Sequence, residues 1–264
     1  MNYSSLSNKS LEEIYGDSIF STPAVSVRID DVFKEVITLL PHHLESFTDS
    51  LVVTQNDTPV GIIGGIEVLD RILKKPAGEF LNTRVIDVMS NSLVIVNKED
   101  KLSELIKHWV HTKRAYAIIP NQYHGYSAIS ARKILEIGVR FKINVTVDTI
   151  PKKKIITFRK DETVKQIISR MFENSTRKLL LDGTKSFIND RIIIQKLVRE
   201  YLHCPETFLN IQGNVFDLEQ VKIVSDNVSI SEACKFMQDM KSPYLMSNDK
   251  IISPWDIVTN LDSC

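Results

Sequence analysis

The sequence predicts an α+β fold made of four tandem repeats, each with the element order β-α-β-β-α. Two observations support this prediction. An acidic residue followed by a β-rich run recurs at Asp17, Asp87, Asp148 and Asp217, with a period of roughly 60 to 70 residues. Each β-rich run is followed by apolar residues at helical spacing and then by two short apolar runs separated by a turn. Such units account for nearly the whole chain.

The first helix of each repeat is predicted from its apolar spacing. In the second repeat the apolar residues are Leu102, Leu105, Ile106, Trp109 and Val110, which follow the i, i+3, i+4, i+7, i+8 pattern of a helix with one buried face. The matching residues of the other repeats are Val32, Val36, Leu39 and Leu40, then Val164, Ile167, Ile168, Met171 and Phe172, and finally Ile230, Ala233, Cys234 and Met237. We expect these residues to form the core.

Helix starts and hairpin turns complete the repeat. Ser229 and Glu232 have the spacing of a capping box, and Ser10 with Glu13 leads an N-terminal segment into a helix. The turns read QNDTP, NQYHG, DGTK and SNDK, and this Asn, Asp and Gly chemistry is typical of tight reversals between strands. A unit of this size cannot bury both faces of its sheet, so the repeats are expected to pair.

Composition narrows the functional classes. The 264 residues are 43% hydrophobic and 25% charged, which is typical of a soluble globular chain with room for two domains. Lys plus Arg and Asp plus Glu number 33 each, and this zero net charge argues against a nucleic-acid or membrane-surface partner. The apolar runs are too short for a membrane span. Three cysteines without a CxxC pair favour a reducing cytoplasm over a disulfide framework or a structural zinc.

The stretch KIISPWDIV, residues 250–258, ends the last repeat and has two interpretations. Ser253, Pro254 and Asp256 fit the N-cap, first and third positions of a helix, where they would satisfy free backbone donors. The same hydroxyl and carboxylate could hold a nucleotide, because a hydroxyl at a helix start suits a phosphate and a carboxylate can accept both ribose hydroxyls. The two roles can also coexist.

The repeat resembles the cystathionine-β-synthase (CBS) domain. VIDVMSNSLVIVNKEDKLSELI in the second copy is close to the usual opening of that family, and IISPWDIV in the fourth is close to its usual ending. The resemblance covers four copies, roughly residues 14–258. CBS domains usually occur in pairs called Bateman modules, so the resemblance implies one module of repeats 1 and 2 over residues 1–140 and a second of repeats 3 and 4 over residues 141–264.

The resemblance implies binding rather than catalysis. Paired CBS repeats form clefts for AMP, ADP, ATP or other adenosyl ligands such as S-adenosylmethionine or NAD. By this analogy Ser253 would lie near the phosphate, and Asp256 would accept the hydroxyls of the ribose. The remaining residues implied for this site in module 2 are Lys241, Lys154 and Lys250 near the phosphates and Ile155 and Ile156 against the adenine. Lys250 replaces the usual Gly, which could crowd the cleft or add a phosphate contact.

The other three copies depart from the pattern of Gly, then Ser or Thr, then Asp. The residues at these positions are Gly61, Gly64 and Glu67 in the first copy, Ser127, Ser130 and Lys133 in the second, and Ser186, Asn189 and Ile192 in the third. A lysine cannot accept ribose hydroxyls. We therefore expect one good site, in module 2, and a candidate second site in module 1 that uses Glu67 or Ser130 with Lys113 and Arg114.

The sequence thus predicts a non-enzymatic cytoplasmic regulator that forms a homodimer and acts on a separate effector protein. It has no Gly-rich phosphate loop and no GxSxG motif, and His108 and His111 lack a carboxylate at the right offset for a metal site, so we expect neither a catalytic residue nor a metal. Two alternatives stay open: a scaffold for protein interaction with empty clefts, and nucleic-acid binding through the basic run of residues 152–160. Adenosyl-ligand titrations and the salt dependence of binding would separate them.

Overall fold

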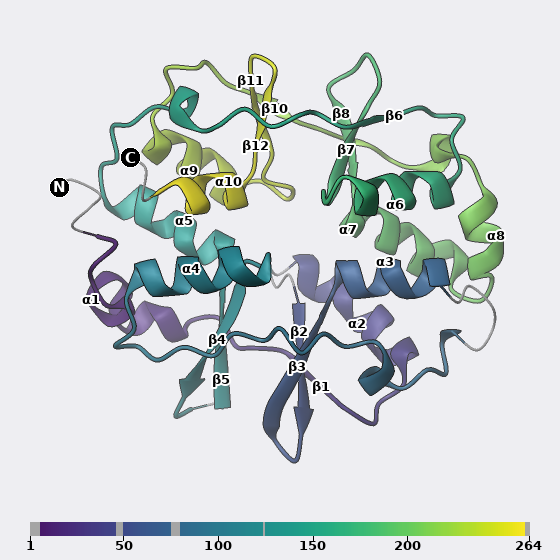
Figure 1. Ribbon diagram of the computed structural model, residues 1–264, viewed down its shortest axis with the longest axis horizontal. Helices are drawn as coiled ribbons and strands as arrows, with labels where there is room; N and C mark the ends of the chain where they lie inside the picture. Colours follow the sequence, from purple (N-terminus) through teal and green to yellow (C-terminus); the bar gives the residue numbers. More distant parts are fainter. Residues whose placement is uncertain (1–5, 46–49, 75–79, 124, 262–264) are drawn as a thin grey trace. The chain divides into compact units, whose positions relative to one another are not determined.

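The computed structural model describes residues 6–45, 50–74, 80–123 and 125–261, and it contains the four predicted repeats (Figure 1). The first repeat comprises β1 (Ser26–Arg28), α2 (Phe33–Glu45), β2 (Ser50–Gln55), β3 (Thr58–Gly64) and α3 (Gly65–Lys74). The second comprises α4 (Leu102–Thr112), β4 (Tyr116–Asn121), β5 (Gly125–Ser130) and α5 (Ala131–Arg140). The third comprises β6 (Thr157–Phe158), α6 (Val164–Glu173), β7 (Lys178–Leu181), β8 (Ser186–Asn189) and α7 (Asp190–Lys196). The fourth comprises β10 (Lys222–Ile223), α9 (Ile230–Gln238), β11 (Leu245–Ser247), β12 (Lys250–Ile252) and α10 (Pro254–Asn260).

Shorter elements connect the repeats. They are α1 (Leu11–Tyr15), η2 (Gly16–Phe20), η4 (Val85–Asp87), η5 (Val147–Thr149), η6 (Leu197–Tyr201), α8 (Pro205–Asn210), η7 (Gly213–Val215) and β9 (Glu219–Gln220). The predicted capping boxes are confirmed. Ser10 and Glu13 exchange side-chain and backbone hydrogen bonds at the start of α1, and Ser229 and Glu232 do the same at α9. Each pair satisfies two backbone donors that the first turn of a helix leaves free.

Every repeat has the same strand pairing. The first strand runs parallel to the second, and the second is antiparallel to the third, as in β1, β2 and β3. In the second repeat a single parallel bridge between Ile95 and Ile118 replaces the first strand. The predicted turns are also confirmed, because the described turn residues with positive φ include Asn56, Asp57, Gly125, Gly183 and Asn248.

The opening stretch of one repeat also pairs with the hairpin of its partner repeat. Residues of β9, at the start of repeat 4, run antiparallel to β8 of repeat 3. Pro23, at the start of repeat 1, bridges to Ser127 of repeat 2, and Ser90, at the start of repeat 2, bridges to Ile62 of repeat 1. Backbone pairing therefore links the opening stretches of repeats 1 and 2 to each other's hairpins, and the opening stretch of repeat 4 to the hairpin of repeat 3.

The chain divides into two compact units that interleave along the sequence. The first unit contains residues 1–24, 92–154 and 221–264, and the second contains residues 25–91 and 155–220. Repeats 2 and 4 therefore fall mainly in the first unit, and repeats 1 and 3 in the second. The predicted modules, residues 1–140 and 141–264, are instead continuous in sequence. This division of the chain stays a prediction.

Helix packing holds each unit together. In the first unit α5 lies beside α9 and α10 (Figure 1). The contact is so close that a Cβ on Gly138 would lie 2.3 Å from the sulfur of Cys234. In the second unit α3 packs against α7, and a Cβ on Gly65 would lie 3.0 Å from the carboxylate carbon of the buried Asp190, closer than ordinary van der Waals contact. A larger residue at either position would force the facing side chain or the helix to shift, which favours glycine at both contacts.

The predicted helix faces are buried except at their edges. Trp109, Ile168 and Met237 are buried, as expected. Val110 is 51% exposed and Phe172 is 37% exposed, so the prediction that these two residues belong to the core is wrong. Both occupy the i+8 position, where a helix with 3.6 residues per turn has rotated away from the centre of its buried face. The prediction that Leu39 belongs to the core is also wrong, because Leu39 is 38% exposed, whereas its neighbour Leu40 is fully buried.

Candidate functional site

The site begins where α10 starts. Asp256 is 3% exposed and Ser253 is 6% exposed. The Asp256 carboxylate accepts the backbone N–H of Ser253 at 3.0 Å and the hydroxyl of Ser253 at 2.5 Å, both on Oδ2. This confirms the capping interpretation of the KIISPWDIV stretch. The same bonds fix the carboxylate in one orientation, which a ligand with hydroxyl groups could use.

A lysine from the opening loop of repeat 3 also contacts this carboxylate. Lys153 Nζ donates to Asp256 Oδ1 at 2.6 Å. The pair is unequal, because the Lys153 side chain is 58% exposed whereas that of Asp256 is 5% exposed. The lysine can therefore leave at little cost in solvation, while the aspartate stays in place. The ammonium occupies a position from which a hydrogen-bond donor reaches Asp256 Oδ1.

Lys250, which replaces the glycine of the family pattern, is buried beneath this loop. Its ammonium donates to the carbonyls of Val147 at 2.8 Å, Asp148 at 3.0 Å and Ile150 at 2.8 Å. These bonds use all three donors of a lysine. Lys250 therefore fixes the loop that carries Lys153. Its predicted contact with a phosphate stays a prediction, and that contact would have to replace one of these three bonds.

The other predicted residues of this site differ in their surroundings. Lys154 and Lys241 are exposed in the first unit, and the Lys241 backbone carbonyl accepts a hydrogen bond from Arg132 at 2.7 Å. Lys152 lies 3.6 Å from Asp249, and both side chains are exposed. Ile155 and Ile156 are half-buried residues of the second unit, so their part in binding adenine stays a prediction.

The candidate second site is only partly assembled within one unit. Ser130 is opposite Tyr116 in the β4–β5 hairpin, and Lys113 and Arg114 lie between the end of α4 and the start of β4. Lys113 ends α4 in a left-handed conformation with φ 54°. Glu67 belongs to the second unit, where its carboxylate accepts the backbone N–H of Gly64 at 2.8 Å and caps α3. The predicted cooperation of Glu67 with the other residues stays a prediction.

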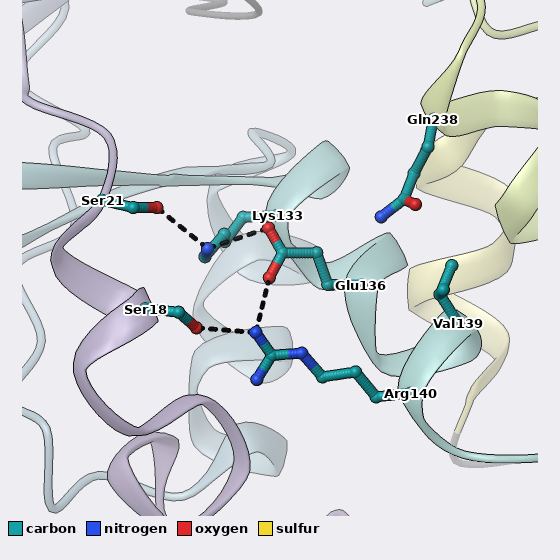
Figure 2. Close-up of a pocket in the computed structure, with 7 residues that line it drawn as sticks. All are labelled: Ser18, Ser21, Lys133, Glu136, Val139, Arg140 and Gln238. Atoms are coloured by element: carbon teal, nitrogen blue, oxygen red, sulfur yellow. Dashed lines mark hydrogen bonds and ion pairs between the residues drawn. The ribbon is translucent and has the colours of Figure 1, made fainter.

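A pocket of about 410 Å³ in the first unit was missed by the sequence analysis (Figure 2). Its lining residues come from η2 and the loop after it, from α5 and from α9, and they are Ser18, Ser21, Lys133, Glu136, Val139, Arg140 and Gln238. The spacing of Lys133, Glu136 and Arg140 along one helix face was a usable signal. The family pattern identifies Lys133 only as a residue that cannot accept ribose hydroxyls.

Two further observations bear on chemistry in the described part of the chain. Burial raises the pKa of the Cys234 thiol to about 12, so this cysteine is not a nucleophile at neutral pH. Among the residues that the structure describes, no cluster of three or more His, Cys, Asp or Glu side chains could hold a metal ion.

Within the described residues, every helix is too short or too polar to span a lipid bilayer.

Comparisons with known proteins find the fold rather than a close relative. No family model and no curated protein matches the sequence. The structure of MJ1225 from Methanocaldococcus jannaschii, described as a proposed archaeal homolog of g-AMPK, matches with a TM-score of 0.77 and 16% identity over 94% of this chain and 98% of that one. An uncharacterized conserved protein from Pyrococcus horikoshii matches with a TM-score of 0.59 and 11% identity, over 93% of this chain and 99% of that one.

A shorter structure, the CBS-domain protein ATU1752 from Agrobacterium tumefaciens, covers 48% of this chain and 89% of its own, with 17% identity and a TM-score of 0.39. The four β-α-β-β-α repeats, their pairwise exchange of opening strands and the match to MJ1225 over nearly the whole of both chains agree with one another. The chain has the fold of four CBS repeats in two Bateman modules.

Proposed function

We propose that this chain is a non-enzymatic regulator that binds an adenosine nucleotide or another adenosyl ligand at Asp256. The ligand class comprises AMP, ADP, ATP, S-adenosylmethionine and NAD. The observation that carries the proposal is the buried, oriented carboxylate of Asp256, which touches a hydroxyl on one side and an exposed ammonium on the other. A carboxylate fixed in this way is suited to accepting the two hydroxyls of a ribose.

Lys153 would change partners when the ligand binds. Its ammonium holds Asp256 in the structure described here, and ribose hydroxyls would take its place. The released lysine, together with the exposed Lys152 and Lys154, would then face the ligand's phosphates. A cation near a phosphate forms a charge-assisted hydrogen bond, which is stronger than a neutral one. The opening loop of repeat 3 would then have two states, one with Lys153 bound to Asp256 and one with Lys153 released. A ligand shifts the equilibrium between two states by the difference in its affinity for them.

The proposal is tested by titrating the purified chain with AMP, ADP, ATP, NADH and S-adenosylmethionine, using calorimetry and thermal denaturation. A ligand at a hundred times its dissociation constant should stabilise the fold by about 2.7 kcal/mol. Asp256→Asn keeps the size of the side chain and should weaken binding by about tenfold or more, since a lost charge-assisted bond costs at least about 1.4 kcal/mol. Asp161→Asn is the matched control, because Asp161 is an exposed, ion-paired aspartate of the second unit. Equal affinities of both variants and the wild type would refute the site.

Comparison of AMP with adenosine tests the exchange of Lys153. Lys153→Met should weaken AMP binding but not adenosine binding, because only AMP offers a phosphate to the released ammonium. Equal losses for both ligands would show that Lys153 acts only by shaping the loop.

One observation favours a second function, that of a ligand-free scaffold. The Asp256 carboxylate is already bonded to Ser253 and Lys153, so the helix start is complete without a ligand. Under this alternative none of the adenosyl ligands would stabilise the chain, and its role would rest on a homodimer or on an effector protein. Sedimentation of the chain alone and after addition of each nucleotide would measure the dimer and any ligand-dependent change. We place either role in a reducing compartment such as the cytoplasm, which is supported by the free thiols of Cys204 and Cys234.

A further inference from the structure

The pocket on α5 contains an excess of positive charge. Its titratable lining residues are Lys133, Arg140 and Glu136, and its other lining residues are neutral (Figure 2). The Lys133 side chain is 7% exposed, that of Glu136 is 28% exposed and that of Arg140 is 42% exposed. A buried ammonium is costly unless it is paired and hydrogen-bonded. Here two cations share one carboxylate, so the pocket keeps a net charge of one positive unit.

Neutral groups of the N-terminal segment hold both cations in place. Lys133 Nζ donates to Ser21 Oγ at 3.1 Å and lies 5.6 Å from the centre of the Tyr15 ring. The Arg140 guanidinium donates to Ser18 Oγ at 2.9 Å and lies 6.0 Å from the same ring. Cations over an aromatic face are attracted by its negative centre. Because these contacts do not involve Glu136, the two cations would remain oriented if its carboxylate moved away.

Glu136 bridges the two cations unequally. Its Oε1 accepts from Lys133 Nζ at 2.8 Å, whereas its Oε2 lies 3.5 Å from Arg140, at the limit of a hydrogen bond. One planar carboxylate on the same helix cannot satisfy both partners well. A tetrahedral oxyanion carries more acceptor oxygens and up to two negative charges, so it could contact both cations at full strength. Glu136 is partly exposed, and the Gln238 side chain from α9 also lines the pocket (Figure 2).

We propose that this pocket binds phosphate or the phosphate group of a monoester, which takes the place of the Glu136 carboxylate between Lys133 and Arg140. Ser21 accepts from Lys133, so its own O–H can donate to the incoming oxyanion. The Gln238 amide would supply a further donor. This site is separate from Asp256 in sequence and in residues, and it does not depend on the function proposed for Asp256.

The test is calorimetric titration of the full chain with inorganic phosphate at constant ionic strength. Glu136→Gln removes the internal competitor and should tighten phosphate binding by about tenfold, the factor that about 1.4 kcal/mol represents. Glu200→Gln is the matched control, because Glu200 is an exposed carboxylate that pairs with Lys196 at 2.7 Å on the same helix face. It changes the net charge equally and should leave phosphate affinity unchanged.

Removal of either cation should have the opposite effect. Lys133→Met should weaken phosphate binding by about tenfold or more. Arg140→Gln provides a second test at a more exposed position, in case the buried Lys133 variant does not fold. The proposal is overturned if Glu136→Gln binds phosphate no better than the wild type and the control, or if folded Lys133→Met or Arg140→Gln binds it as well as the wild type. Failure of both the wild type and Glu136→Gln to bind phosphate at millimolar concentration would also overturn it.

A second set of titrations identifies the source of the phosphate group. In an Asp256→Ala background, AMP and inorganic phosphate should bind this pocket with similar affinity if only the phosphate is recognised. A much higher affinity for AMP that is lost in Lys133→Met would assign the pocket to a nucleotide phosphate. An AMP affinity that is lost with Asp256 but unaffected by Lys133 would belong to the other site, so the two proposals fail separately.

Discussion

The starts of α10 and α5 occupy the same place in repeats 4 and 2, yet they carry opposite charges. At α10 the third helical residue is Asp256, which pairs with Lys153 from the opening loop of repeat 3. At α5 it is Lys133, which donates to Ser21 from the opening segment of repeat 1. Both side chains are at least nine-tenths buried. In both repeats, therefore, this position faces the opening segment of the partner repeat.

The positions that precede these helices share a structural role. Lys250 donates to three backbone carbonyls between residues 147 and 150, and Ser127 donates to the carbonyl of Phe20 at 3.1 Å. Each side chain therefore anchors the opening segment of the partner repeat by bonding to backbone carbonyls of that segment. Such carbonyls are present whatever the sequence of the segment. Since the anchor does not depend on the charge of the third helical residue, that residue can differ between repeats. Under the two proposals, the fold fixes the position at which a ligand meets each helix start, and the third helical residue determines whether ligand hydroxyls or an oxyanion are bound.

Reversal of the charge at Asp256 should have the largest effect. Asp256→Lys places a buried ammonium beside Lys153 and removes the acceptor of Ser253, so the free energy of unfolding should fall by about 4 kcal/mol. The second substitution Lys153→Glu should recover part of this loss, but only about 1 kcal/mol, because Lys153 is largely exposed. Thermal and urea denaturation of the single and double variants measure both values. If Asp256→Lys is as stable as the wild type, the position tolerates either charge. The opposite charges of Asp256 and Lys133 would then not contribute to the stability of the fold.

Removal of the two anchoring side chains, Lys250 and Ser127, should lower the free energy of unfolding by smaller and unequal amounts. Lys250→Met leaves three carbonyls without their donor and should cost about 3 kcal/mol of stability, whereas Ser127→Ala should cost about 1.5 kcal/mol. The serine also accepts from Asn121 at 2.8 Å, so its removal affects more than one bond. Denaturation of both variants under the same conditions measures the loss in the free energy of unfolding for each, and the two losses can then be compared. Equal losses would show that Lys250 is no stronger an anchor than the hydroxyl.

The close contact of α5 with α9 gives a third test, on the side of the phosphate pocket. Gly138→Ala would bring a methyl group within 2.3 Å of Cys234 Sγ, and this overpacking should cost about 2 kcal/mol despite the better helix propensity of alanine. Cys234→Ala removes the sulfur and should restore most of the stability in the double variant. Because Gln238 on α9 lines the pocket, Gly138→Ala should also weaken phosphate binding. A loss of stability that Cys234→Ala does not restore would place the clash elsewhere.

The smallest effect concerns a third helix start, at α9, where the acid is exposed. The backbone N–H and hydroxyl of Ser229 hold the pKa of Glu232 below its usual value of 4.5. A depressed folded-state pKa contributes stability above the unfolded pKa, and this contribution is lost as the pH falls through the folded value. NMR titration of the Glu232 carboxyl should show the depression in the wild type and its reduction in Ser229→Ala. An ordinary pKa in both proteins would mean that the capping box is not formed in solution.

Much of the fold follows from local sequence patterns. The spacing of Leu102, Leu105 and Trp109 predicts α4, and Ser229 with Glu232 predicts where α9 begins. Turn residues such as Asn248 predict the hairpins, because they adopt a positive φ that most residues avoid. These signals depend only on neighbours a few residues apart. The period that repeats them four times then predicts the α+β class.

The site was predictable only in part. The sequence predicted Ser253 and Asp256 at the start of a helix, because the spacing of a capping box is local. It did not predict that Lys153 pairs with Asp256 or that Lys250 is buried under the loop, because these contacts join residues about 100 positions apart. The exposure of Val110 and Phe172 was also missed, since periodicity gives the direction of a helix face but not the extent of the neighbour that covers it.

Local sequence patterns are sufficient to predict the four repeats, their helices and turns, and the acid at the third position of α10, because each rests on backbone preferences and short-range hydrogen bonds. Local patterns do not predict that residues 1–24, 92–154 and 221–264 form one unit. They also do not predict that Lys133, Glu136 and Arg140 of α5 lie beside Ser18 and Ser21 in a charged pocket. The physical reason is that burial and charge pairing depend on which distant segments come together, and the packing of two repeats sets that choice.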